Sequence, residues 1–172
     1  MKSMIKEEIT RIKNLMTISE ELEMGPYMDS TYLKTPEQAG IDEYETELIV
    51  FDTIKDAIEH NMKLVMIRPE YVQSARTLID DKGANLLVGT VIGFPHGDNS
   101  HGEKMDEALK AIQDGVDELD FVVNYKAFKK GDLDTVKKEV SEGTVIGISE
   151  GKSVKWIIES AALTSEEIAE LT

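Results

Sequence analysis

The sequence predicts an α/β fold with a parallel sheet, and three observations support this prediction. Short apolar runs of strand length recur along the chain, and segments with helical periodicity lie between them. One apolar run follows the next at intervals of roughly 25 to 35 residues, which is the spacing of successive βαβ units. The crossovers of such units are right-handed in nearly all known cases, so the helices are expected to cover the sheet.

Five segments have the length and apolar content of strands. They are Tyr27 to Leu33, Lys63 to Ile67, Leu86 to Ile92, Leu119 to Asn124, and Val154 to Glu159. Strands of parallel sheets are apolar on both faces because helices cover the sheet, and these runs fit that description.

Helix starts and helical faces occur between the strands. Thr35-Pro36-Glu37-Gln38 combines a capping threonine, a proline at the first helical position and a glutamine at the third. Arg68-Pro69-Glu70 and Thr164-Ser165-Glu166-Glu167 are read as further starts. Apolar residues at helical spacing follow two of the strands: Val72, Ala75, Leu78 and Ile79, and then Met105, Ala108, Leu109 and Ile112. The structure of Glu142 to Gly151, which contains three glycines, is left open.

The amino-terminal residues form a separate segment. Apolar residues at Ile5, Ile9, Ile12 and Leu15 predict an amphipathic helix over residues 1–24, which ends at Gly25-Pro26. Residues 25–172 are predicted to be one domain, because 172 residues with 41% apolar content suffice for one core.

Composition excludes several classes of function. Without cysteine, the chain has no disulfide, thiolate nucleophile or cysteine metal site. A net charge of −15 opposes nucleic-acid binding, although a few local groups can still hold one phosphate. No apolar run approaches the roughly 20 residues of a membrane helix, so no membrane association and a cytoplasmic location are expected.

Several motifs resemble deoxyribose-phosphate aldolase, a class I aldolase family. Met28 to Lys34 is similar to the family's first barrel strand. Four further segments follow in the family's order: Arg68 to Val72, Thr90 to Gly97, Asp114 to Asp120, and Val154 to Glu159. The resemblance covers the chain from about Met28 onward.

The resemblance implies a (β/α)8 barrel, of which this sequence would supply about five parallel strands after an N-terminal helix. It also implies cleavage of 2-deoxyribose 5-phosphate, a small phosphorylated sugar, without metal or organic cofactor. The family's Schiff-base lysine lies on strand six in a Lys-Thr-Ser-Thr-Gly motif, which does not occur here. The sequence is therefore expected to be the front part of a longer barrel, inactive by itself and prone to self-association or homo-oligomer formation through its unpaired edge strands and uncovered apolar faces.

Two residues are predicted to be catalytic. Strand alternation directs Asp120 to the barrel interior, where it matches the family's active-site aspartate. Lys155 is directed inward from the next strand and matches a family lysine that does not form the Schiff base. An interior lysine needs an anionic partner, and Asp120 is the expected one.

Four further residues are expected to line the substrate pocket: Asp29, Thr31, Thr90 and Asn124. The segment His96 to Glu103 holds two histidines and two acidic residues, but the family has a similar turn without metal, so no metal site is predicted. Gly147 to Ser153 lacks the glycine spacing of a phosphate-binding P-loop.

Two alternatives remain beside the incomplete aldolase. The chain could be a non-catalytic remnant that acts as an oligomerisation or binding module. It could instead be a different aldolase in which Lys155 itself is the nucleophile.

Overall fold

The sheet has five parallel strands in the order in which they occur along the chain. The protein is represented by a computed structural model that describes residue 7 and residues 24–172, so the helix predicted over residues 1–24 lies outside the described residues apart from residues 7 and 24. The strands are β1 (Asp29–Tyr32), β2 (Leu64–Ile67), β3 (Leu87–Ile92), β4 (Glu118–Val122) and β5 (Ser153–Ile157). All five predicted strands are confirmed.

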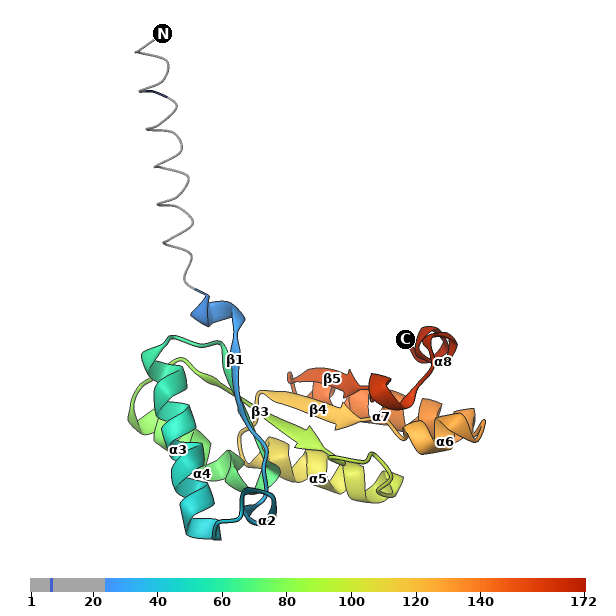
Figure 1. The fold of residues 1–172 in the computed structure, drawn as a ribbon, viewed down its shortest axis with the longest axis horizontal. Helices are drawn as coiled ribbons and strands as arrows, with labels where there is room; N and C mark the ends of the chain where they lie inside the picture. Colours follow the sequence, from blue (N-terminus) through green and yellow to red (C-terminus); the bar gives the residue numbers. More distant parts are fainter. Residues whose placement is uncertain (1–6, 8–23) are drawn as a thin grey trace.

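Helical segments connect the strands, and Figure 1 shows α3, α4 and α5 packed along the same side of the sheet. The α-helices are α2 (Pro36–Ala39), α3 (Glu43–Glu59), α4 (Val72–Asp81), α5 (His101–Gln113), α6 (Tyr125–Lys129), α7 (Leu133–Ser149) and α8 (Ser165–Leu171). Short 3-10 turns are η1 (Gly25–Tyr27), η2 (Pro69–Tyr71) and η3 (Ser160–Ala162). Consecutive strand order with helices on one side is the arrangement of a β/α barrel wall.

Both predicted capping motifs are confirmed. The Thr35 side chain accepts a hydrogen bond from the Gln38 amide, and the Gln38 side chain accepts one from the Thr35 amide. Thr164 and Glu167 make the same reciprocal pair at the start of α8. The local sequence therefore fixes where these two helices begin.

The segment whose structure was left open is the second half of α7. A Cβ atom at Gly147 would lie 2.2 Å from Cγ2 of Val154, so a larger residue there would push the helix away from β5. The glycine permits close packing of α7 on the sheet. Its low helix propensity costs about 1 kcal/mol, which tertiary contact offsets.

The two faces of the sheet differ in what covers them. One face packs on the helices through Val65, Ile67, Leu119 and Phe121 in the main core. On the other, inner face, Leu64, Met66 and Val91 form a smaller cluster. Strand alternation predicted that Leu119 and Phe121 lie opposite Asp120, and this is confirmed.

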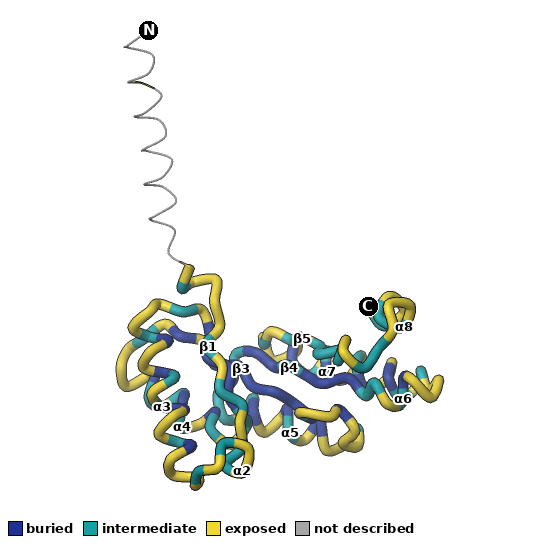
Figure 2. Tube along the Cα trace, in the orientation of Figure 1, coloured by how far each residue is buried: buried dark blue, intermediate teal, exposed yellow. Residues whose placement is uncertain are grey.

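The expectation that the apolar face of β5 would be uncovered is wrong. Trp156 stacks on Phe121 with ring centroids 4.8 Å apart, and its indole N–H donates to Oγ1 of Thr144 on α7. The helix α7 therefore covers this face of the strand. Figure 2 shows β3 and β4 largely buried, whereas β1 and β5 are a mixture of half-buried and exposed residues.

No helix within the described residues is both long enough and apolar enough to span a membrane.

Candidate functional site

Charged side chains from three strands meet on the inner face of the sheet. They are Asp29 of β1, Glu118 and Asp120 of β4, and Lys155 of β5. Glu118 and Asp120 share a face because they are two residues apart on one strand, and Asp120 is the register partner of Lys155. We call these four residues the inner-face cluster.

Lys155 pairs with Glu118 rather than with Asp120. Its Nζ donates to Oε1 of Glu118, and Oδ2 of Asp29 lies 3.8 Å away. The prediction that Lys155 pairs with Asp120 is therefore wrong. Asp120 is still close enough for its charge to raise the pKa of Lys155. The long lysine side chain leans along the strand to the neighbouring carboxylate, a direction that strand alternation does not specify.

The surroundings of Lys155 favour its protonated form. Burial by itself would lower the pKa of Lys155, but the hydrogen bond to Glu118 and the charges of Asp120, Glu118 and Asp29 together raise it above its ordinary value. A Schiff-base nucleophile must be a neutral amine, so this environment opposes that role. The ion pair is better explained as a structural feature of the inner face.

Asp120 is in a different situation from the other carboxylates. Its Oδ1 is buried and has no hydrogen-bond partner among the described residues. Burial raises the pKa of Asp120 to about 6, with Glu118 and Asp29 adding to the rise and Lys155 opposing it. A carboxyl group with a pKa near neutrality can both accept and donate a proton, which suits general acid–base chemistry.

The two parts of the inner-face cluster also differ in depth. Asp29 and Glu118 are the first residues of their strands, so the Lys155 pair lies toward the amino ends of the strands. Asp120 lies one layer nearer the carboxyl ends, where active sites of β/α barrels are found. The Lys155–Glu118 ion pair thus lies nearer the amino ends of the strands, and the candidate acid–base residue Asp120 lies nearer their carboxyl ends.

Two of the four predicted pocket residues have the expected placement. Asp29 belongs to the inner-face cluster, and Thr31 shares its face because it is the register partner of Met66. Asp29 lies close to the Lys155 ammonium, whereas Thr31 is exposed on an end strand of the sheet.

Thr90 is not an inner-face residue, and Asn124 lies after the end of β4. Thr90 is fully buried on the helix-covered side, and its hydroxyl donates to the carbonyl of Ile67. Asn124 lies beyond the end of β4 and caps α6, with Oδ1 accepting the Ala127 amide. The predicted pocket-lining role of Thr90 is wrong, and the side-chain oxygen of Asn124 is engaged in a cap.

A buried ion pair supports the carboxyl end of β4. Lys104 of α5 and Glu139 of α7 lie 2.7 Å apart, and their side chains are 0% and 1% exposed. Lys104 Nζ also donates to the carbonyl of Val122, and Glu139 accepts the amide of Asn124. The pair joins two helices to the strand that bears Asp120, and burial lowers the pKa of Lys104 against the opposing effect of Glu139.

The loop between β3 and α5 packs against this pair. Gly93 has φ of +67°, and a Cβ atom there would lie 2.7 Å from Cε of Lys104. Its amide donates to Oε2 of Glu107 at 2.8 Å. In the same segment Asp98 pairs with Lys126. Within residues 24–172 no group of three or more histidine, cysteine or acidic side chains could hold a metal ion.

Sequence reasoning missed Glu118, Lys104 and Glu139. Glu118 had a signal, since it lies two residues before Asp120 and shares its face by strand alternation. Lys104 and Glu139 had none, because charged residues on amphipathic helices normally face solvent.

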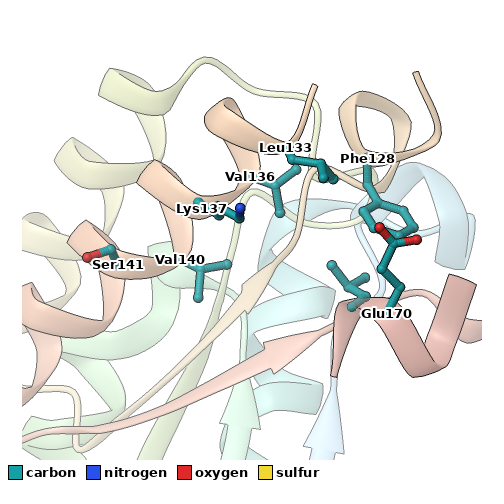
Figure 3. A pocket seen from close by; sticks show the side chains of 8 residues that line it. Phe128, Leu133, Val136, Lys137, Val140, Ser141 and Glu170 are labelled. Atoms are coloured by element: carbon teal, nitrogen blue, oxygen red, sulfur yellow. The ribbon is translucent and has the colours of Figure 1, made fainter. Parts of the chain in front are cut away.

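A groove elsewhere on the molecule lies between α6, α7 and α8. It has a volume of about 470 Å³ and is mostly apolar. Figure 3 shows Val136 and Val140 along α7, with Phe128 of α6 and Glu170 of α8 at the other side. The residues of the inner-face cluster do not line this groove.

Five consecutive parallel β/α units have the arrangement of part of a β/α barrel wall. The deoxyribose-phosphate aldolase of Thermococcus gammatolerans is 36% identical over 146 residues, which are 85% of this chain and 61% of that protein. The enzyme of that name from Staphylococcus saprophyticus is 40% identical over 82% of this chain and 59% of its own length. This chain thus spans about three fifths of the curated relatives that it matches.

Solved structures agree with these matches. An aldolase called QR15 is 31% identical with a TM-score of 0.70, and the alignment covers 87% of this chain and 61% of QR15. The deoxyribose phosphate aldolase of Aeropyrum pernix is 25% identical with a TM-score of 0.72 over 86% of this chain and 57% of that one. No family model matches the chain. Over about 85% of its length, the chain is similar to deoxyribose-phosphate aldolases.

Asp120→Asn is expected to stabilise the fold above pH 6. The folded-state pKa of Asp120 is raised to about 6, so the native state binds the proton more tightly than the unfolded chain does. The free energy of unfolding should therefore fall as pH rises from about 4 to about 6, by on the order of 2 kcal/mol. Asparagine does not ionise, so the variant does not lose this free energy of unfolding as pH rises.

Urea unfolding at pH 4 and pH 7.5 measures this effect. The variant should match the wild type at pH 4 and exceed it at pH 7.5. Asp56→Asn, which changes an exposed carboxylate on α3, is the control and should show no such pH dependence. An equal stability difference at both pH values would contradict the burial of an ionisable Asp120.

Proposed function

We propose that the chain forms the first five β/α units of a class I lyase that cleaves 2-deoxyribose 5-phosphate into acetaldehyde and glyceraldehyde 3-phosphate. The observation that supports this most is Asp120. It is a half-buried inner-face carboxyl with a buried Oδ1 and a pKa of about 6, in a chain 36% identical to a named deoxyribose-phosphate aldolase.

The chemistry explains why such a carboxyl is useful. Retro-aldol cleavage removes a proton from a hydroxyl group, breaks a carbon–carbon bond and leaves a carbanion that must be protonated. One group that titrates near neutral pH can serve both proton transfers. Asp120 is the proposed acid–base residue, and no residue of this chain is assigned as the covalent amine.

The remaining cluster residues have supporting roles in this proposal. Lys155 holds Glu118 and Asp29 in place at the amino ends of the strands, and Thr31 offers a hydroxyl on the same face. The proposed substrate is a small phosphorylated sugar, the proposed location is the cytoplasm, and no organic cofactor or metal is invoked. A homo-oligomer is also proposed, since the Aeropyrum pernix relative is described as tetrameric.

A covalent chimera tests this function. This chain would be joined to the part of the Thermococcus gammatolerans aldolase that lies after the matched residues, and cleavage of 2-deoxyribose 5-phosphate would be assayed. We expect turnover, and Asp120→Asn should lower kcat by about 100-fold to 10,000-fold with a much smaller change in KM. Asp56→Asn is the matched control. An active chimera whose kcat does not depend on Asp120 would contradict the assigned role.

A non-catalytic binding or assembly module is the second candidate. The observation in its favour is that Lys155, the only lysine of the inner-face cluster, is held by carboxylates and kept protonated. The intact mass of the native protein separates the two functions. A mass of about 28 kDa, from the usual barrel length of about 250 residues, supports the lyase. A mass of 19.2 kDa favours the module.

A further inference from the structure

The outer side of α3 exposes a stripe of apolar side chains. Tyr44, Leu48 and Phe51 follow one another at intervals of four and three residues, so they lie on one side of the helix. Tyr44 is 68% exposed and Leu48 is 45% exposed, whereas Phe51 is half-buried. Figure 1 shows α3 and α4 next to each other on the helix-covered side of the sheet. Exposed apolar side chains that gather on one helix face are typical of an interaction surface.

Two hollows lie along this stripe. The first has a volume of about 470 Å³, and Tyr44 and Tyr71 are among its lining residues. The second has a volume of about 460 Å³ and is lined by Phe51 of α3 and by Thr77 and Leu78 of α4. Both are open to solvent, which suits the side chains of a docked polypeptide better than an enclosed small molecule. We call the stripe and the side chains that line the two hollows the α3–α4 face.

The α3–α4 face is negatively charged. Glu43, Glu47 and Glu70 line the first hollow. Asp81 lines the second, and no basic side chain among the described residues lines either hollow. Arg68 pairs with Glu70 at 3.1 Å, but in the part of the chain that the structure describes Glu43 and Glu47 have no ion-pair partner. The face therefore offers carboxylates to a cationic partner.

Tyr71 lies within this negative charge. Burial raises the pKa of Tyr71, and the charges of Glu70, Glu43 and Glu47 raise it further against the opposing effect of Arg68. Carboxylates from α3 and from the turn before α4 thus act on one phenol group. Such a surface repels nucleic acids and anionic membranes, because both are negatively charged.

The shape and charge of the α3–α4 face favour a basic helix over a second copy of this chain. In a two-fold dimer, Glu43 and Glu47 of one copy would face the same carboxylates of the other, and each chain has a net charge of −15. The 17 residues of α3 span about 25 Å, so a helix of about four to five turns can lie along it. A helix whose apolar side occupies a groove between two helices is a recurrent mode of recognition.

We propose that the α3–α4 face binds an amphipathic helix of a different protein. Its apolar side would lie on Tyr44, Leu48 and Phe51, and its lysine or arginine side chains would pair with Glu43 and Glu47. The sheet lies between this face and the inner-face cluster, so the inference does not depend on the proposed function.

A synthetic peptide tests the proposal on the 172-residue chain. The probe consists of about 18 leucine and lysine residues, with the leucines three and four positions apart so that one side of its helix is apolar. Fluorescence anisotropy of the labelled peptide gives Kd. A peptide of the same composition, ordered so that the leucines are spread around the helix, should bind at least about tenfold more weakly. Equal affinity for the two peptides would show attraction by charge alone and would overturn the proposal.

Leu48→Ser tests the apolar contact. The substitution should raise Kd by about tenfold or more, because Leu48 lies in the middle of the stripe. Val145→Ser is the matched control, since Val145 is a 62% exposed apolar residue on α7, and it should change Kd by less than about twofold. An unchanged midpoint of thermal unfolding shows that each variant is folded. Equal effects of the two substitutions would contradict docking on the α3–α4 face.

The charged contact has its own pair of variants. Glu43→Gln with Glu47→Gln should raise Kd by about fivefold and reduce the dependence of Kd on salt concentration. Asp134→Asn with Glu150→Gln removes two exposed carboxylates of α7 and should change Kd by less than about twofold. If both double variants weakened binding equally, the peptide would be responding to net charge, and the assigned ion pairs would be wrong.

NMR of the wild-type chain locates the peptide without any substitution. Amide signals of Tyr44, Leu48 and Thr77 should shift when the peptide is added, whereas those of Val145 and Ile148 should not. Shifts confined to α7 would overturn the proposal.

Two further results would identify a different occupant of the α3–α4 face and would also overturn the proposal. Self-association in sedimentation that Leu48→Ser abolishes would assign the face to a second copy. Peptide binding that occurs only after residues 1–24 are deleted would assign it to that segment of the chain.

Discussion

The isolated 172-residue chain is expected to show no cleavage of 2-deoxyribose 5-phosphate above a buffer control. Positioned acid–base groups typically accelerate a reaction only about 100-fold to 10,000-fold, and Asp120 can supply no more than that. Carbon–carbon cleavage also needs an electron sink for the carbanion. In a class I aldolase the covalent amine provides it.

Lys155 is not expected to replace that amine. Its pKa is raised, after the effect of burial is overcome, by the hydrogen bond to Glu118 and by three nearby carboxylates. The side chain is 46% exposed but points to the amino ends of the strands, where Glu118 and Asp29 begin β4 and β1. It is therefore both protonated and directed away from the carboxyl ends, where a substrate would bind.

Reductive trapping measures this directly. The purified chain would be incubated with acetaldehyde and borohydride, and any reduced adduct would be mapped by mass spectrometry, with a full-length relative as positive control. We expect no stoichiometric adduct at Lys155. An adduct there, together with turnover that disappears in Lys155→Ala, would establish the alternative in which Lys155 is the nucleophile.

Lys104→Met is expected to lower the free energy of unfolding by about 3 to 5 kcal/mol. The substitution leaves Glu139, which is 1% exposed, without the ammonium that lies 2.7 Å from it. It also removes the donor to the carbonyl of Val122. Methionine has a similar length, so the expected loss reflects the unpaired charge more than a cavity.

Urea denaturation at constant pH gives the measurement, and Lys110→Met is the matched control. Lys110 lies on the same helix and its side chain is 65% exposed, whereas that of Lys104 is 0% exposed, so its replacement should change stability much less than Lys104→Met does. The double variant Lys104→Met with Glu139→Leu should recover much of the loss because no charge remains buried alone. Equal effects of Lys104→Met and Lys110→Met would contradict a strong contribution from the buried pair.

The sequence alone determined the strands, the capped helix starts and the inward direction of Asp120. These features depend on local rules. Thr35 with Gln38 and Thr164 with Glu167 need only residues three positions apart, and strand alternation fixes which neighbours share a face with Asp120. The motifs quoted from Met28 onward also sufficed to indicate the resemblance to deoxyribose-phosphate aldolases, and the comparisons confirm this resemblance over about three fifths of those proteins' length.

Only the tertiary structure decided which charges pair and which face Thr90 occupies. Three carboxylates from β1 and β4, those of Asp29, Glu118 and Asp120, lie near Lys155. Side-chain length and packing determine that its ammonium contacts Glu118. β3 is apolar along nearly its whole length, so its alternation gives no sign that Thr90 faces the helices. Lys104 and Glu139 are buried together because α5 and α7 pack at the end of β4. Burying one of these charges without the other would be strongly unfavourable, so both must be buried together. Long-range contacts between α5, α7 and β4 determine this, and the local sequence does not encode it.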